Sequence, residues 1–114
     1  MTALVKGTDF SIQDIGTGAL GGLKVLLVKT VNTADATNTI PVTLTDYGIA
    51  ANGFLGLLAW THTTDNSVSV MESDHTTAVS SGVLTITVGT GTNDDARLIL
   101  IFGLSGEASP GAAL

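Results

Sequence analysis

The sequence predicts an all-β fold, either an antiparallel β-sandwich or a jelly-roll-like small domain, with an extended N-terminal arm. Threonine is the most frequent residue, and valine, isoleucine and glycine are abundant, whereas the helix formers Glu, Lys, Gln, Arg and Met are scarce. Short apolar runs follow one another closely, separated by clusters of Gly, Asn, Asp, Ser and Thr. Six or seven short strands at this spacing are typical of a sandwich, a jelly roll or a small barrel.

Six segments are predicted strands: Leu23–Val31, Thr39–Thr45, Gly53–His62, Ser67–Glu72, Gly82–Gly89 and Ala96–Gly103. The second and fifth alternate apolar and polar residues strictly, as half-buried strands do. One helical turn is predicted in Thr45–Gly53, with Asp46 as its cap and Gly53 as its end. Asp65-Asn66 and the loop "GTGTNDD" are each expected to close a hairpin.

The chain of 114 residues is long enough for one domain. Residues 1–22 mix single apolar residues with turn formers in "KGTDFSIQDIGTGALGG", which is typical of an extended arm or an edge strand. Residues 23–104 form the predicted β-sandwich domain, and residues 105–114 form a predicted flexible C-terminal tail.

Charge and composition exclude several classes of function. The net charge is −6, and the only basic residues are Lys6, Lys24, Lys29 and Arg97, so neither nucleic acid nor an anionic membrane is an expected partner. There is no cysteine, hence no disulfide or thiolate site. The N-terminus lacks the apolar run of a signal peptide, and no segment is long and apolar enough to span a membrane.

Both histidines fall in the stretch Thr61–Gly82, where a metal or acid–base site would have to assemble. The candidates are His62, Asp65, Glu72, Asp74 and His75. A two-residue turn at Asp65-Asn66 places His62 opposite Ser69 and Ala59 opposite Glu72, which separates the histidines by roughly 20 Å if the strand continues to His75. We therefore expect solvated loop and rim groups, with no metal, catalytic or cofactor-binding residue. A histidine meeting its copies on a three-fold axis stays an alternative.

Three further candidates have an ordinary structural interpretation beside a functional one. Asn93, Asp94 and Asp95 are expected to form a solvated turn with Arg97 pairing locally, although their oxygens suit calcium. No nucleophile or phosphate-loop motif is present, so we predict no enzyme and no cofactor. Trp60 is expected in the core, with a sugar-stacking platform as the alternative.

Two predicted strands are apolar on both faces. Ala96–Gly103 carries Leu98, Leu100 and Phe102 on one face and Ile99 and Ile101 on the other. Gly53–Trp60 is assigned Phe54 and Leu58 on one face and Leu55, Leu57 and Ala59 on the other. A sheet with one wet face alternates apolar with polar residues, and a sandwich covers only one face of each sheet. The second face needs the N-terminal arm, a loop or another subunit to cover it, and we expect a homo-oligomer.

The segments "PVTLTDYGIAANGFLGLLAWTHTTDNSVSV" and "SSGVLTITVGTGTNDDARLILIFG" resemble small virion structural proteins of tailed bacteriophages, in which a V-x-L-x-D-[YI]-G segment precedes an apolar strand and a G-x-L-T-I-T hairpin follows. The resemblance covers about Ile40 to Gly103. It implies a structural role in the virion. Within that role we expect a capsid decoration (cement) protein, a homotrimer bound to the outer lattice of the major capsid protein, located in the virion after assembly in the host cytoplasm. A tail or fibre component, or a carbohydrate-binding β module, is the alternative. The family supplies no catalytic residue.

Overall fold

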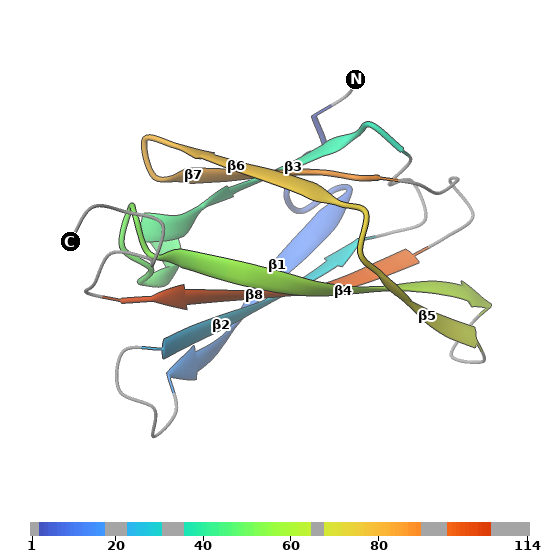
Figure 1. The fold of residues 1–114 in the computed structure, drawn as a ribbon, viewed down its shortest axis with the longest axis horizontal. Coiled ribbons are helices and arrows are strands. Elements are labelled where there is room, and N and C mark those ends of the chain that lie inside the picture. The colour runs from blue at the N-terminus through green and yellow to red at the C-terminus, as the bar shows by residue number, and fades with distance from the viewer. Residues whose placement is uncertain (1–2, 18–22, 31–35, 65–67, 90–95, 106–114) are drawn as a thin grey trace.

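The computed structural model describes residues 3–17, 23–30, 36–64, 68–89 and 96–105, which form two antiparallel sheets stacked on one another (Figure 1). One sheet has the strand order β1-β2-β8-β4-β5 and the other β3-β7-β6. The strands are β1 (Phe10–Thr17), β2 (Leu23–Thr30), β3 (Thr39–Thr43), β4 (Phe54–Thr64), β5 (Val68–Glu72), β6 (Thr76–Ser80), β7 (Val83–Thr87) and β8 (Ala96–Leu104). The predicted all-β sandwich is confirmed.

The core lies between the two sheets and is built from the alternating inward residues of their central strands. The five-stranded sheet contributes Leu26, Val28, Ile99 and Ile101, all fully buried. The three-stranded sheet contributes Ile40, Val42, Leu84 and Ile86, also fully buried. Pairing is nested, because β2 pairs with β8 and β3 pairs with β7, so the chain passes repeatedly from one sheet to the other.

The predicted helical turn exists as the 3-10 helix η1 (Leu44–Tyr47), but its ends differ from the expectation. Thr43 occupies the N-cap position without a side-chain hydrogen bond, and Asp46 lies inside the turn. The turn ends at Gly48, whose φ of 81° is a left-handed conformation that glycine adopts at low cost.

The N-terminal segment belongs to the sandwich, which corrects the domain boundary drawn at residue 22. β1 pairs with β2 along its length and forms one edge of the five-stranded sheet, so the edge-strand alternative is right and the free arm is wrong for these residues. Ala3 also pairs with Thr39, and Leu4 is buried. Residues 1–2 and 18–22 and, apart from Ser105, the predicted tail lie outside the described residues.

Two connections after β5 differ from the prediction. "TTAVS" was expected in a loop but forms β6, which turns into β7 through Ser81 and Gly82, both at positive φ (52° and 78°). "GTGTNDD" was expected to join a hairpin, yet β7 and β8 lie in different sheets, so this segment connects the sheets. In the described part of the chain no helix is long and apolar enough to cross a membrane.

Candidate functional site

The β4–β5 hairpin sets the positions of most candidate residues, and its predicted register is confirmed. His62 is aligned with Ser69, Trp60 with Met71 and Ala59 with Glu72. The register shifts by one residue between His62 and Thr64, and the Asp65-Asn66 turn itself lies outside the described residues. His62 is thus half-buried beside β8, aligned with Ala96, and separate from the other candidates.

His75 does not continue the β5 strand but turns inward and joins a buried cluster with Glu72 and Arg97. Oxygen Oε1 of Glu72 lies 2.8 Å from His75 Nε2 and 3.1 Å from Arg97 Nε. The exposed fractions of the three side chains are 1% for His75, 9% for Glu72 and 0% for Arg97. The expectation of solvated rim groups is therefore wrong for these residues, because the chain crosses to the second sheet after Glu72 and carries His75 into the interior.

The hydrogen bonds of His75 fix its tautomer. The backbone N–H of Gly89 donates to Nδ1 over 3.0 Å, so Nδ1 carries no proton. Nε2 then carries the proton and donates to Glu72. Both ring nitrogens are engaged, and the carboxylate that would orient a catalytic histidine is held by Arg97. The cluster thereby links β5 and β8 of the five-stranded sheet to the segment that follows β7 of the three-stranded sheet.

Glu72, Asp74 and His75 are the one group among the described residues whose potential ligand atoms could meet a metal ion, lying within 4.8 Å of one another. The geometry does not favour an ion. A metal would have to displace either the Glu72 or the Gly89 bond of His75, and the Arg97 guanidinium lies against the same carboxylate. The cluster is structural: Glu72 and Arg97 pair within the five-stranded sheet, and His75 connects that ion pair to the segment that follows β7.

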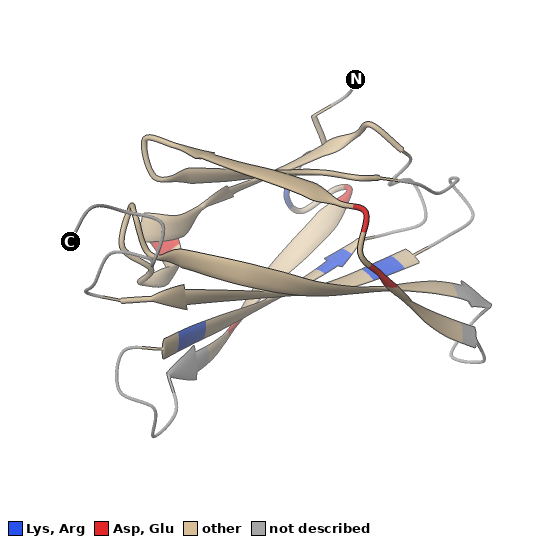
Figure 2. Cartoon of the chain, in the orientation of Figure 1, with Lys and Arg blue, Asp and Glu red and all other residues tan. Residues whose placement is uncertain are grey.

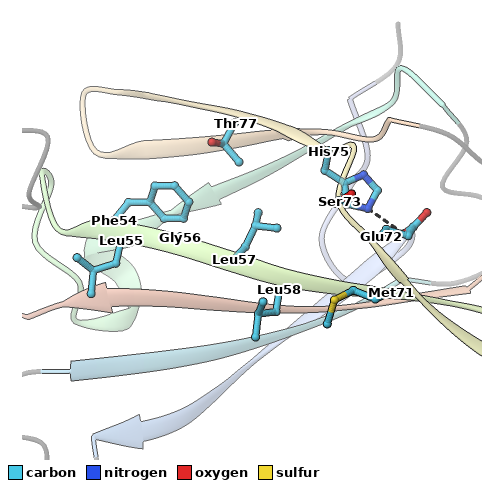
Figure 3. A pocket seen from close by; sticks show the side chains of 10 residues that line it. All are labelled: Phe54, Leu55, Gly56, Leu57, Leu58, Met71, Glu72, Ser73, His75 and Thr77. Atoms are coloured by element: carbon cyan, nitrogen blue, oxygen red, sulfur yellow. Dashed lines mark hydrogen bonds and ion pairs between the residues drawn. The ribbon is translucent and has the colours of Figure 1, made fainter.

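An apolar groove of about 420 Å³ opens beside this cluster, between β4 and β6 (Figure 3). Phe54 and Leu57 of β4 point up into it, and Thr77 of β6 points down from the other sheet. Met71, Glu72, Ser73 and His75 form its end wall. The groove is open because β5 pairs with β4 only from Ala59 onward, which leaves Phe54–Leu58 paired with β8 alone in the described structure.

The outer face of the five-stranded sheet carries a continuous run of apolar side chains. We define this outer face by Leu23, Val25, Leu27, Leu58, Trp60, Met71, Leu98, Leu100, Phe102 and Leu104, which the strand registers place side by side. Leu58 is 44% and Met71 58% exposed, and the other eight are half-buried. Charged positions are sparse on these strands and lie toward their ends (Figure 2). A patch of this kind marks an interaction surface in soluble proteins.

The predicted assignment of side chains to the two faces is confirmed for β8 and needs one correction in β4. Ile99 and Ile101 are buried in the core, and Leu98, Leu100 and Phe102 lie on the outer face. A register shift between Phe54 and Gly56 turns Phe54 inward beside Leu57 and leaves Leu55 exposed. The bulge breaks the alternation on which the sequence assignment relied.

The structure places two of the remaining candidates, Trp60 and Arg97, and four others lie outside the described residues. Trp60 lies on the outer face, between Leu98 of β8 and Met71 of β5, so its predicted core position is wrong. Its neighbours are apolar side chains, which suit a protein partner better than a sugar. Asp65, Asn93, Asp94 and Asp95 lie outside the described residues. Arg97 pairs with Glu72.

The chain matches no family model, no curated protein and no solved structure with which it was compared. The strongest functional features are therefore those of the chain itself, namely the outer face and the groove. The apolar residues at both odd and even positions of Ala96–Gly103 signal the outer face in the sequence. The groove has no such signal, because it depends on where β5 stops pairing with β4.

Proposed function

We propose that this chain is a non-enzymatic structural protein of a bacteriophage virion that assembles as a homo-oligomer through its outer face. The capsid decoration (cement) protein, a homotrimer on the lattice of the major capsid protein, is the form we favour. The observation that carries the proposal is the apolar outer face, because a lone protomer leaves all ten of its side chains in contact with water.

The dimensions of the outer face suit a protein interface. β8 has nine residues, and at ~3.4 Å per residue it is about 30 Å long. The face spans four strands, β2, β8, β4 and β5, so at ~4.8 Å per strand it is about 20 Å wide, or roughly 600 Å² in area. A standard interface buries about 800 Å² on each partner, so the outer face with a modest polar rim supplies the required area.

The virion assignment rests on the resemblance of Ile40–Gly103 to small tailed-phage structural proteins, and the trimeric state comes from the same source. The structural role of the charged cluster agrees with it, since Glu72, His75 and Arg97 bond to one another rather than presenting free groups to a substrate. Repetition of a modest contact over a capsid lattice gives strong attachment through avidity.

A matched pair of lysine substitutions tests the oligomer. Leu100→Lys puts a charge at the centre of the outer face, where Leu27 and Leu58 flank it. Thr85→Lys puts the same charge on the outer face of the three-stranded sheet, opposite Pro41 and Ala78. We expect Leu100→Lys to be folded with a lower mass than the wild type by light scattering, because it loses the outer-face contact, and Thr85→Lys to keep the mass of the wild type. Equal masses for all three proteins would refute the contact.

The virion location is tested separately by peptide mass spectrometry of purified particles from the phage that encodes the chain. A decoration protein is expected in a fixed ratio to the major capsid protein and is lost when Leu100→Lys replaces the wild type. Particles that never contain the chain would refute the virion role while leaving the oligomer intact.

A further inference from the structure

The edge strands of the two sheets differ in how they are protected against pairing with another chain. β1 carries Asp14, which bonds to Lys24, and a register shift just after it. β3 carries Pro41, and Ala3 covers its end at Thr39. β5 carries Glu72. Charges, prolines, bulges and covering segments are the devices by which soluble proteins keep sheet edges from pairing.

β6 is the fourth edge, and in the part of the chain that the structure describes it has none of these devices. Its sequence, "TTAVS", contains no charge and no proline, and its register with β7 is regular over all five residues. Every residue of the strand is exposed, including Val79 at 39%. Within the described residues β6 pairs only with β7, so its other row of backbone donors and acceptors is available.

We propose that β6 pairs antiparallel with β6 of a second copy of this chain, joining two three-stranded sheets into one sheet of six strands. An isologous contact of this kind is self-complementary, since each strand offers the same row of N–H and C=O groups to the other. The second copy suits the site because an uncharged edge is met by an equally uncharged strand.

The groove favours this occupant. Thr77 and Val79 face inward, because they are aligned with the buried Ile86 and Leu84. A strand added beside β6 lies over the groove, and its own Thr77 and Val79 then point toward Phe54 and Leu57. Because a two-fold axis relates the two copies, each copy fills the groove of the other. β5 does not obstruct the contact, since it pairs with β4 only beyond the open half.

The proposed register makes a definite prediction about which residues meet. A two-fold axis through the middle of Thr76–Ser80 places Ala78 opposite Ala78 of the second copy and Thr76 opposite Ser80. Opposed residues in antiparallel strands have Cα atoms about 4.5–5.5 Å apart, which is within disulfide range. The chain has no native cysteine, so introduced cysteines report this register alone.

Cysteine crosslinking under mild oxidation tests the pairing. Ala78 lies on the solvent side of β6, aligned with Thr85, so Ala78→Cys leaves the fold intact. We expect Ala78→Cys to form a disulfide-linked dimer at least about tenfold faster than Thr76→Cys, because pairing gives the first thiol a high effective concentration. The double variant Thr76→Cys/Ser80→Cys should crosslink as efficiently as Ala78→Cys.

A charged variant supplies the negative control. Ala78→Lys would place two lysines directly opposite one another, so in the Thr76→Cys/Ser80→Cys background it should slow crosslinking about tenfold, whereas Ala78→Thr should not. Equal rates for Ala78→Cys and Thr76→Cys, or no crosslinking by either, would overturn the proposal. Crosslinking of Ala78→Cys that survives Leu100→Lys would show that the β6 contact is independent of the outer face.

Discussion

The two sheets of this sandwich share one core, but their outer faces differ in polarity. On the three-stranded sheet the outward positions are Thr39, Pro41, Thr43, Thr76, Ala78, Ser80, Val83, Thr85 and Thr87. On the five-stranded sheet the same positions on the central strands carry leucine, valine, phenylalanine and tryptophan. The pattern of the three-stranded sheet is typical of a sheet with one face in water. The pattern of the five-stranded sheet is typical of a sheet with both faces covered.

This difference shows that apolar residues are distributed unevenly between the strands of the two sheets. β7 alternates strictly between buried apolar residues and half-exposed threonine or valine, while β8 is apolar at nearly every position. Both strands are central in their sheets, so position alone does not explain the contrast. The outer face of the three-stranded sheet has the composition of a surface that stays in water, and the outer face of the five-stranded sheet has the composition of a surface that a partner covers, as we propose.

The largest expected effect concerns the interior that both sheets share. Glu72→Leu would remove the Glu72 carboxylate from the buried Arg97, and breaking a buried ion pair in this way costs about 3–5 kcal/mol. We expect that loss in the free energy of unfolding, measured by denaturant titration. Ser73→Ala, at the exposed neighbouring position, should change it by less than ~0.5 kcal/mol. Equal effects would mean that the cluster does not stabilise the fold.

A pair of glycines separates the inner side of the five-stranded sheet from its outer face. A Cβ on Gly103 would lie 2.7 Å from Ile49 Cγ2, so Gly103→Ala overpacks the core and should cost about 1–3 kcal/mol. A Cβ on Gly56, beside Phe102, meets nothing within 4 Å. Gly56→Ala should therefore be neutral or stabilise by up to ~1 kcal/mol. Thermal unfolding measures both, and the reverse order would contradict the assigned faces.

A smaller effect is expected from removing one hydroxyl. Thr61 Oγ1 is buried, and among the described residues it has no hydrogen-bond partner. Thr61→Val should stabilise the fold by about 1 kcal/mol, because it removes an unsatisfied polar atom. Thr85→Val, on the wet face, should leave stability within ~0.5 kcal/mol of the wild type. Destabilisation by Thr61→Val would indicate that the hydroxyl is satisfied in solution.

The smallest effect lies away from both faces, where the N-terminal segment meets η1. Lys6 Nζ donates to the Tyr47 hydroxyl over 2.7 Å, and this hydrogen bond raises the pKa of Lys6 above 10.5. A raised lysine pKa stabilises the fold below the unfolded value of 10.5, and the contribution disappears as the pH rises through the folded value. Tyr47→Phe should bring the pKa of Lys6 down in an NMR titration. An unchanged titration would exclude the bond.

Periodicity predicted most of the fold, because the core strands bury one face regularly. β3, β7 and β8 were predicted within about two residues at each end, and the β4–β5 register followed from hairpin arithmetic. β6 was missed because its five residues are all exposed and only Val79 is a large apolar residue. The placement of β7 and β8 in different sheets depends on tertiary pairing, which a short loop between two strands does not reveal.

The candidate sites were harder to predict for a physical reason. The outer face was predicted, because a strand that is apolar on both faces needs each of those faces to be covered. The Glu72–His75–Arg97 cluster was not, because it forms where the chain changes sheets and brings together residues 25 positions apart. The bulge at Phe54 and Gly56 likewise has no signature beyond a glycine, yet it decides which side chains line the groove.

The most direct measurement is the molar mass of the wild-type chain by sedimentation equilibrium at micromolar concentration. An outer face built to be covered predicts a single species whose mass is a small multiple of 11.5 kDa, with the one tryptophan, Trp60, shielded from a soluble quencher. A folded species of 11.5 kDa with Trp60 open to the quencher would contradict it.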